Sequence, residues 1–479
     1  MTFSQTFLRD SAVYALPTLA SRGVGVILFP LYTRVLSAAE YGSLDLLMVF
    51  ATFINLTIAL EVSQAVARFY PMEQNAERKI AYASTAFWFT VSCYTLFLAV
   101  VLSFSTDLSS LVMGRADLES VFQVGMVYIW LNGIFYLIQN QLRSELRSKS
   151  YATVSLLATC VTAAGAVALA YGLSWGLAGI LYASAGGAFV GCGAGLWCLR
   201  TSYRFHFRAG HLLEMIRFSA PLVLSGIAVF VSLYIDRLMI NHFLSLDDVG
   251  VYGIGFRVAS VANVVMLPIQ IALTPLIYAH YQEEQTPKQL ALLFRWFLVL
   301  ALLMFLSLSL FADEIIRLFA TPAYYSAATV VVYLVPALLL SNMYIFAPGI
   351  ALAGKTRLVL YINLLGAVLH AVLNWLLVPA LGIRGASLAM LLGYACVFVA
   401  YMGMSQRLYV VPHKWRRLGV SVIGVGVLAF GFSDVGSVAM RTAALVGACC
   451  FFIVTGLVQN SELRHAGSLF AHRFLPARQ

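Results

Sequence analysis

The chain alternates long apolar stretches with short polar ones from one end to the other. Each apolar stretch approaches the roughly 20 residues that a helix needs to cross a bilayer core about 30 Å thick. The shorter polar and apolar alternation of outer-membrane barrel strands does not occur. The pattern predicts fourteen membrane-spanning helices, near residues 11–34, 44–67, 80–104, 119–141, 151–172, 175–199, 214–243, 250–277, 291–312, 325–351, 358–379, 384–405, 416–433 and 440–459.

One turn motif between spans occurs twice. Leu36-Ser-Ala-Ala-Glu-Tyr-Gly42 follows the first span, and Leu244-Ser-Leu-Asp-Asp-Val-Gly250 follows the seventh. A second glycine landmark keeps its distance, since Gly176 lies 134 positions after Gly42 and Gly385 lies 135 positions after Gly250. Preserved spacing predicts two structural repeats. An even number of crossings gives them the same orientation, so we expect an axis along the membrane normal.

The repeats predict an all-α membrane protein with two lobes around a central cavity. We expect an N-lobe of six helices in residues 1–205, a C-lobe of six in 206–410, and two further helices with a cytoplasmic tail in 411–479.

Composition agrees with a membrane protein. The chain is 61% hydrophobic and only 10% charged, whereas soluble domains are roughly 45–50% apolar and about 25% charged. The net charge of +10 does not indicate a nucleic-acid partner, because the basic residues lie in short segments between spans and form no continuous patch. Of the 30 Lys and Arg residues, 22 fall in segments that lie on the same side of the membrane as the N-terminus. By the positive-inside rule, both termini are therefore predicted to be cytoplasmic.

No catalytic or metal-binding pattern is found. The seven cysteines lie inside apolar runs, without a CxxC pair, and are predicted to be packing residues. There is no P-loop and no HExxH motif. We expect no enzyme activity, no metal and no cofactor. A membrane polysaccharide polymerase or ligase would need a large outer loop, and the longest, near residues 107–119, is short.

Several spans carry polar residues that line up on one face, although a charge at the bilayer centre costs about 2.5–3.5 kcal/mol on insertion scales. Such stripes are typical of the walls of a wet cavity. The residues are Arg22 in the first span, Glu61 and Gln64 in the second, Asp236 in the seventh with Arg237 on its flank, and Asn363, His370 and Asn374 in the eleventh.

Structural interpretations of the same residues stay open. Asp236 and Arg237 could lie near the end of their helix and reach the headgroups. Glu61 could form an ion pair with Arg68. The polar residues of the eleventh span could hydrogen-bond between packed helices.

The segment Pro30-Leu-Tyr-Thr-Arg-Val-Leu-Ser-Ala-Ala-Glu-Tyr-Gly42, together with Tyr234-Ile-Asp-Arg237 and the second turn, resembles the polysaccharide transporter branch of the MOP flippase superfamily, the Wzx-type oligosaccharide flippases. The resemblance implies a bacterial inner-membrane protein that moves an undecaprenyl-diphosphate-linked oligosaccharide across the membrane by alternating access, for O-antigen, capsule or exopolysaccharide synthesis. Its partners would be that lipid-linked glycan, membrane lipids and other polysaccharide assembly proteins.

Under this resemblance, arginine forks would bind the diphosphate or acidic sugars. We expect Arg22, Arg237 and Arg257 in that role, with Asp236 orienting Arg237 and with Tyr14, Tyr32 and Tyr234 facing sugar. Glu61 is the candidate for a coupling ion, proton or sodium. The alternatives are a lipid II-type peptidoglycan precursor flippase and a MATE-like multidrug exporter, although cation export favours acidic cavity residues.

Overall fold

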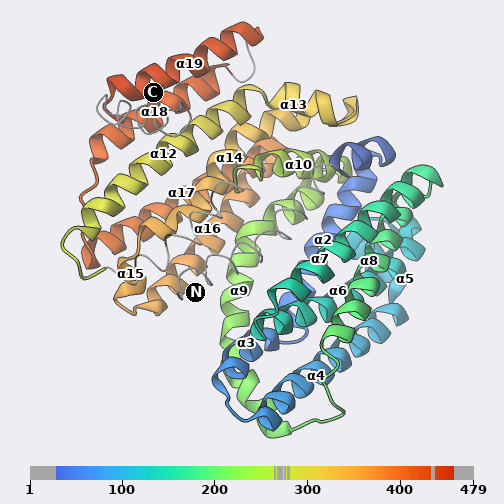
Figure 1. Cartoon of the computed structure of the whole chain (residues 1–479). Coiled ribbons are helices and arrows are strands. Elements are labelled where there is room, and N and C mark those ends of the chain that lie inside the picture. The colour runs from blue at the N-terminus through green and yellow to red at the C-terminus, as the bar shows by residue number, and fades with distance from the viewer. Residues whose placement is uncertain are drawn as a thin grey trace, which may run out of the picture. The chain divides into compact units, whose positions relative to one another are not determined.

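The computed structural model describes residues 28–457 except 264–265, 267–272, 274–276, 278–280 and 433–436. All regular secondary structure in these described residues is helical (Figure 1). The chain forms two compact units. The first unit comprises Met1–Gly253 with Phe319–Tyr324, and the second unit comprises Ile254–Leu318 with Tyr325–Gln479. The lobe boundary predicted after residue 205 stays a prediction.

The helices of the first unit are α2 (Ala38–Thr57), α3 (Val62–Met72), α4 (Ala76–Ser103), α5 (Ser105–Met113), η1 (Ala116–Leu118), α6 (Glu119–Ser144), α7 (Ser148–Gly165) with its π-helical extension η2 (Ala166–Gly172), α8 (Gly176–Cys198) and α9 (Ala209–Phe243). The second unit contains α12 (Thr286–Leu310), α14 (Ala328–Asn342), η4 (Met343–Phe346), α15 (Gly349–Leu352), α16 (Thr356–Leu381), α17 (Ile383–Leu408), α18 (Trp415–Phe432) and α19 (Val438–Val454). Three elements cross the boundary, namely α10 (Leu246–Ala259), α13 (Ala312–Phe319) and η3 (Pro322–Ala327).

The predicted spans agree closely with these helices. Ten helices of the described part are long and apolar enough to cross a membrane, and they correspond to predicted spans three to seven and nine to thirteen. The second predicted span is a bent pair, α2 and α3, and the last is the shorter apolar helix α19. The chain is therefore a multi-pass membrane protein. Much of the first predicted span and of the eighth lies outside the described residues.

Close packing in the first unit depends on small residues along one face of α8. Gly187, Gly191 and Gly195 recur every four residues, so they share a face. A Cβ at Gly187 would lie 1.9 Å from the Thr162 hydroxyl, and one at Gly195 would lie 2.3 Å from the Ile138 side chain. Glycine therefore lets α8 approach α6 and α7 closely, which is how helices pack in a bilayer that supplies little hydrophobic driving force.

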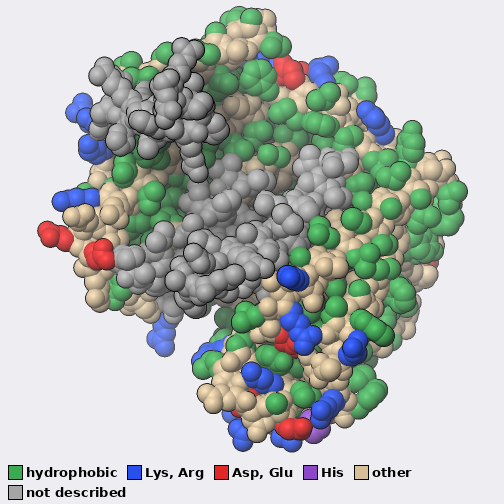
Figure 2. Space-filling view, viewed as in Figure 1, with side chains coloured by type: hydrophobic (Ala, Val, Ile, Leu, Met, Phe, Trp, Pro, Cys, Tyr) green, Lys and Arg blue, Asp and Glu red, His purple; other side chains and the backbone are tan. Residues whose placement is uncertain are grey.

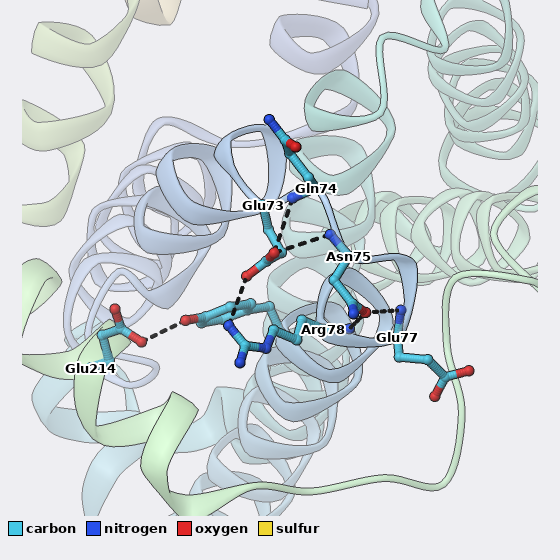
Figure 3. Close-up of polar contacts among 7 residues, drawn as sticks. Glu73, Gln74, Asn75, Glu77, Arg78 and Glu214 are labelled. Atoms are coloured by element: carbon cyan, nitrogen blue, oxygen red, sulfur yellow. Dashed lines mark hydrogen bonds and ion pairs between the residues drawn. The ribbon is translucent and has the colours of Figure 1, made fainter.

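Basic residues gather at the end of the first unit where α3 and α4 meet. Figure 2 shows Lys and Arg side chains there, while hydrophobic side chains cover much of the neighbouring helix surface. The α3–α4 turn is held by its own polar groups (Figure 3). Glu73 accepts hydrogen bonds from the Gln74 and Asn75 amides at 3.0 Å, and Asn75 caps α4. These bonds, the Asn75 amide first, lower the pKa of Glu73 below its ordinary value.

The α6–α7 turn contains a residue whose replacement by glycine is predicted to stabilise the protein. Leu146 has a left-handed φ of 55°, and its side chain is 79% exposed. We expect Leu146→Gly to add about 1 kcal/mol of stability, because glycine adopts this conformation without strain and little burial is lost. Leu111, 75% exposed within α5, is the control. There the same change should lower the thermal midpoint, and equal effects at both sites would contradict the argument.

The loop between α17 and α18 contains a half-buried histidine, His413, which predicts an acid-sensitive step in stability. The ring of His413 lies 4.8 Å from that of Phe294 and 4.9 Å from that of Trp415. Burial lowers its pKa from 6.5 to about 4. Between these values the unfolded chain binds the proton more strongly, so stability is full above pH 6.5 and falls as the pH drops toward 4. The thermal midpoint of His413→Phe, measured across this pH range, should therefore fall less than that of the wild-type protein.

Candidate functional site

The two copies of the turn motif build the same local structure. Ser37 caps α2 in a capping box with Glu40, whose carboxylate accepts from the Ser37 amide at 2.9 Å. Ser245 holds the start of α10 in the same manner, since its hydroxyl donates to Asp248 at 2.6 Å and accepts from the Asp248 amide. Serine at the N-cap with an acidic residue three positions later satisfies amides that a helix start leaves unpaired. Both copies of the motif therefore form the N-terminus of a helix.

The last glycine of each motif packs against the other motif. A Cβ at Gly42 would lie 2.1 Å from the Leu246 carbonyl oxygen, and a Cβ at Gly250 would lie 2.0 Å from the Ala38 carbonyl oxygen. Ala38 precedes Gly42 by four residues, as Leu246 precedes Gly250. The contact is thus reciprocal, as a two-fold relation between the copies would require. We call this pair of helix starts the turn contact.

A buried ion pair lies beside the turn contact. Arg237 of α9 is 2% exposed, and its Nε donates to Oδ2 of Asp45 in α2 at 3.1 Å. Its Cζ also lies 5.6 Å from the ring centroid of Tyr234 and 5.3 Å from that of Tyr252. Two aromatic faces and one carboxylate therefore surround the guanidinium. Such a charge is stabilised only while its partners stay in place.

Glycine also makes room for Asp45. With the two turns aligned, Gly253 occupies the position of Asp45 in the second copy. A Cβ at Gly253 would lie 3.1 Å from Oδ2 of Asp45. Asp45 was not among the predicted site residues, because it resembles an ordinary acid in the first half of a helix. The substitution of glycine at the equivalent place is the signal that could have found it.

Asp236 is fully buried and accepts a hydrogen bond from the Tyr252 hydroxyl at 2.7 Å. Tyr252 thus contacts both charged residues: its hydroxyl donates to Asp236, and its ring packs against the guanidinium of Arg237. The alternative in which Asp236 and Arg237 reach out to the headgroups is wrong, since both side chains lie inside the first unit. An orienting role of Asp236 stays a prediction.

The other predicted substrate contacts are placed less completely. Tyr234 is half-buried and packs on Phe230 at 5.1 Å. Tyr32 packs on Leu28, Ala166 and Ala183. Arg257 is half-buried near the end of α10 in the second unit. Arg22 and Tyr14 lie outside the described residues.

Glu61 lies at a break in a span. Leu60 and Glu61 both have left-handed φ angles, of 49° and 51°, and the axes of α2 and α3 differ there by 45°. Its carboxylate accepts from Ser63 at 3.3 Å, and no salt bridge joins it to Arg68 within the described part of the chain. The ion-pair alternative is therefore wrong. Gln64 is exposed one turn further on. Non-glycine residues held in this conformation cluster at functional sites.

A polar cavity of about 390 Å³ lies in the first unit among α6, α7 and α8. Hydroxyl and amide side chains line it together with aromatic rings, and none of the described lining residues is charged. Gln139 donates to the Ser155 hydroxyl at 2.9 Å across it. The lining residues are Leu28, Tyr128, Asn132, Phe135, Gln139, Ser155, Ala158, Thr159, Thr162, Ser184 and Ala188. Neutral hydrogen-bonding groups beside aromatic faces suit a polyhydroxylated ligand. We call it the polar cavity.

The polar residues of α16 lie between packed helices. His370 and Asn374 are buried, and the Asn374 amide donates to the His370 carbonyl at 3.0 Å. The Tyr401 hydroxyl of α17 donates to Asn363 at 3.4 Å. This placement favours the packing interpretation, and a cavity role for the three residues stays a prediction.

Comparisons with known proteins give a consistent family. A family model described as "Polysaccharide biosynthesis protein" matches residues 7–280, and a model described as "MatE" matches residues 221–376. The Lsg locus putative protein 1 of Haemophilus influenzae is 23% identical over 58% of this chain and 67% of its own length. The succinoglycan biosynthesis transport protein ExoT of Rhizobium meliloti is 24% identical over 55% of this chain and 52% of its own.

Solved structures show the same fold at low identity. A multidrug resistance MATE family transporter of the MOP superfamily, in its inward-facing conformation, covers 82% of this chain and 94% of that chain with a TM-score of 0.65 and 16% identity. The lipid II flippase MurJ, in an inward closed conformation, covers 97% of this chain and 100% of that chain with a TM-score of 0.67 and 12% identity. The match to the "Polysaccharide biosynthesis protein" model over residues 7–280 confirms the family resemblance that the turn motifs indicated, and the solved structures agree with it in fold.

Proposed function

The chain belongs to the polysaccharide biosynthesis protein family, and we propose that it is a flippase for a lipid-linked oligosaccharide. It would move an undecaprenyl-diphosphate-linked glycan from the cytoplasmic to the outer leaflet of a bacterial inner membrane by alternating access, for surface polysaccharide synthesis. ExoT, the MATE family transporter and the flippase MurJ are transport proteins by name, which supports the expectation that the chain is not an enzyme.

The observation that carries the proposal is the buried Arg237–Asp45 pair beside the turn contact. A diphosphate cannot cross hydrocarbon unaided, and a guanidinium binds its oxygens through two parallel hydrogen bonds. With both termini cytoplasmic, as the positive-inside rule predicts, the turn contact would lie on the outer side. While the turn contact is intact, α2 and α10 stay packed together and Asp45 stays paired with Arg237. When the contact opens, Arg237 loses Asp45 and gains the anionic head of the substrate as its partner.

The polar cavity supplies the second element of the proposal. Sugars present many hydroxyl groups and few charges, so their binding needs donors and acceptors in a neutral wall. Asn132 and Gln139 offer both, and Tyr128 and Phe135 offer faces on which sugar rings pack. The glycan would lie against this wall while its diphosphate approaches the arginine.

A MATE-like exporter is the second candidate, because the MatE model matches residues 221–376. Glu61 at the helix break is the residue that would favour it, since cation exporters use acidic cavity groups. A lipid II-type flippase has the same physical requirements as the main proposal and differs in its glycan.

One experiment separates these functions. Protein reconstituted in proteoliposomes should move a fluorescent undecaprenyl-diphosphate-linked oligosaccharide between leaflets, measured by its accessibility to a membrane-impermeant quencher. Vesicles without protein, and efflux of a lipophilic cationic dye, are measured in parallel. Dye efflux without movement of the glycolipid would refute the flippase proposal. Movement of lipid II at the same rate as the oligosaccharide would assign the peptidoglycan precursor.

Glu61 provides a prediction about energy coupling. We expect Glu61→Gln to reduce the acceleration of transport by a proton or sodium gradient roughly tenfold, a coupling free energy usual for linked sites. The amide keeps the shape of the side chain but cannot bind a cation by charge. The rate is measured in the proteoliposomes with and without each gradient. Glu77→Gln, at an exposed residue of α4, is the control. Unchanged gradient dependence in Glu61→Gln would remove Glu61 from coupling.

A further inference from the structure

A basic cavity lies in the second unit, at one end of its membrane-spanning helices. It measures about 430 Å³, and its lining includes Lys288 and Arg295 from the first turns of α12 and Lys414 and Arg417 from the start of α18. Leu457, just after α19, closes another side, and Arg417 donates to the Gly456 carbonyl at 3.4 Å. Because α12 and α18 both begin here, the cavity lies where the spans meet the membrane surface.

The described lining of this basic cavity carries charge of one sign only. Four of the nine described residues that line it are cationic and none is acidic. Four like charges around one space repel one another, and an anion placed among them removes that repulsion. The cavity is therefore complementary to a phosphate-sized anion at the membrane surface.

An apolar groove continues from the basic cavity along the same helices. It measures about 490 Å³ and lies among α12, α14, α17 and α18. The two spaces share Leu418. Trp415 lines the groove at the first residue of α18, a position where tryptophan anchors a helix at the level of the headgroups.

Glycines keep the groove open. A Cβ added at Gly419 or at Gly426 would meet no heavy atom within 4 Å, and both residues line the groove. Groove-lining side chains such as Val399 and Ile423 are each 68% exposed. The groove thus presents an open apolar channel next to a cationic end.

We propose that the basic cavity and the apolar groove together bind one anionic glycerophospholipid. The phosphate of the headgroup lies among Lys288, Arg295, Lys414 and Arg417, and an acyl chain lies in the groove along α18. Charge complementarity selects an anionic lipid over a zwitterionic one, since a headgroup with its own cation would face four more. Continuity of the two spaces selects a lipid over free phosphate. The site is separate from the polar cavity, which lies in the first unit.

The headgroup is tested with the full-length protein. Delipidated protein is mixed with vesicles of phosphatidylglycerol or phosphatidylcholine, and the lipid it retains is measured by native mass spectrometry. Wild-type protein should retain phosphatidylglycerol, and the site variant should retain at least roughly tenfold less of this lipid. The site variant combines K288Q, R295Q, K414Q and R417Q. The control variant changes four basic residues of the first unit, combining R78Q, K79Q, R200Q and R204Q. Equal retention of the two lipids, or equal loss in both variants, would overturn the proposal.

The position of the acyl chain is tested separately, by substitutions in α18. Gly426→Leu fills the groove and should lower retention of phosphatidylglycerol about as much as the headgroup variant. Gly431→Leu is the matched control, because Gly431 also has no atom within 4 Å of its added Cβ but does not line the groove. Thermal midpoints within a degree or two of each other would exclude unfolding as the cause. Retention unaffected by Gly426→Leu would place the lipid elsewhere.

A second phosphate-bearing lipid identifies the source of the anion. Undecaprenyl phosphate is offered in the same vesicles as a competitor. If Gly426→Leu abolishes retention of undecaprenyl phosphate and spares that of phosphatidylglycerol, the groove holds the polyprenyl carrier and the proposal is wrong. If wild-type protein retains neither lipid, the groove is covered by the chain itself and the proposal is equally wrong. Free phosphate that displaces phosphatidylglycerol at millimolar concentration would show that the groove contributes nothing.

Discussion

Replacing Arg237 by alanine is expected to abolish transport and to lower stability by about 3–5 kcal/mol, the usual cost of removing one partner of a buried ion pair. Asp45 would then stay as a carboxylate with one quarter of its side chain exposed. Asp45→Ala should have a similar effect, because it leaves the guanidinium of Arg237 buried without this partner. The readouts are the thermal midpoint of purified protein and glycolipid movement in proteoliposomes.

A double variant separates a structural role from a substrate role. Apolar residues of similar volume often replace a buried ion pair at little cost, so Arg237→Met combined with Asp45→Leu should recover most of the lost stability. Transport should stay absent, because the guanidinium proposed to receive the diphosphate beside the turn contact is gone. Full transport by the double variant would show that the pair only holds the helices. Arg237→Lys should restore part of the activity, since an ammonium lacks the planar fork that binds phosphate oxygens in pairs.

The fold was largely predictable because hydrophobic length carries so much information in a bilayer. An apolar run of about 20 residues has few alternatives to a spanning helix, since every backbone amide and carbonyl must be paired within it. Predicted spans such as 119–141 and 384–405 therefore agree with α6 and α17 to within a few residues. The break at Leu60 was not predictable in this manner. Neither glycine nor proline marks it, and its left-handed angles depend on packing around it.

The candidate site was predictable in part. Repetition of the turn singled out the two segments that pack together in the structure, and the cost of charge within a span singled out Arg237, which lies in a buried ion pair beside them. The partner of Arg237 was missed because Asp45 is 192 positions away and nothing within α2 distinguishes it. The polar cavity was missed for a related reason. Asn132, Ser155 and Ser184 each stand alone on a different helix, and only packing brings them to one wall.

The turn contact leads to the second large effect. We expect Gly250→Ala to destabilise the protein by at least the roughly 1–3 kcal/mol typical of an overpacked core, and to reduce transport severely. Its Cβ would lie 2.0 Å from a backbone oxygen, the Ala38 carbonyl. Backbone cannot move aside as a side chain can, so α2 and α10 must separate. Gly42→Ala should act alike, because its Cβ meets the Leu246 carbonyl at 2.1 Å.

Both substitutions act on one contact, so they should not be additive. Once one alanine has separated the two helix starts, the second alanine has less to displace, and the double variant should lose less stability than the sum of the single losses. Gly193→Ala in α8 is the control, since its Cβ meets nothing within 4 Å. There alanine should stabilise by roughly 0.5–1 kcal/mol, the ordinary helix preference. Additive losses for Gly42 and Gly250 would mean that the glycines act independently. The turn contact would then not be the element whose opening releases Arg237 to the substrate.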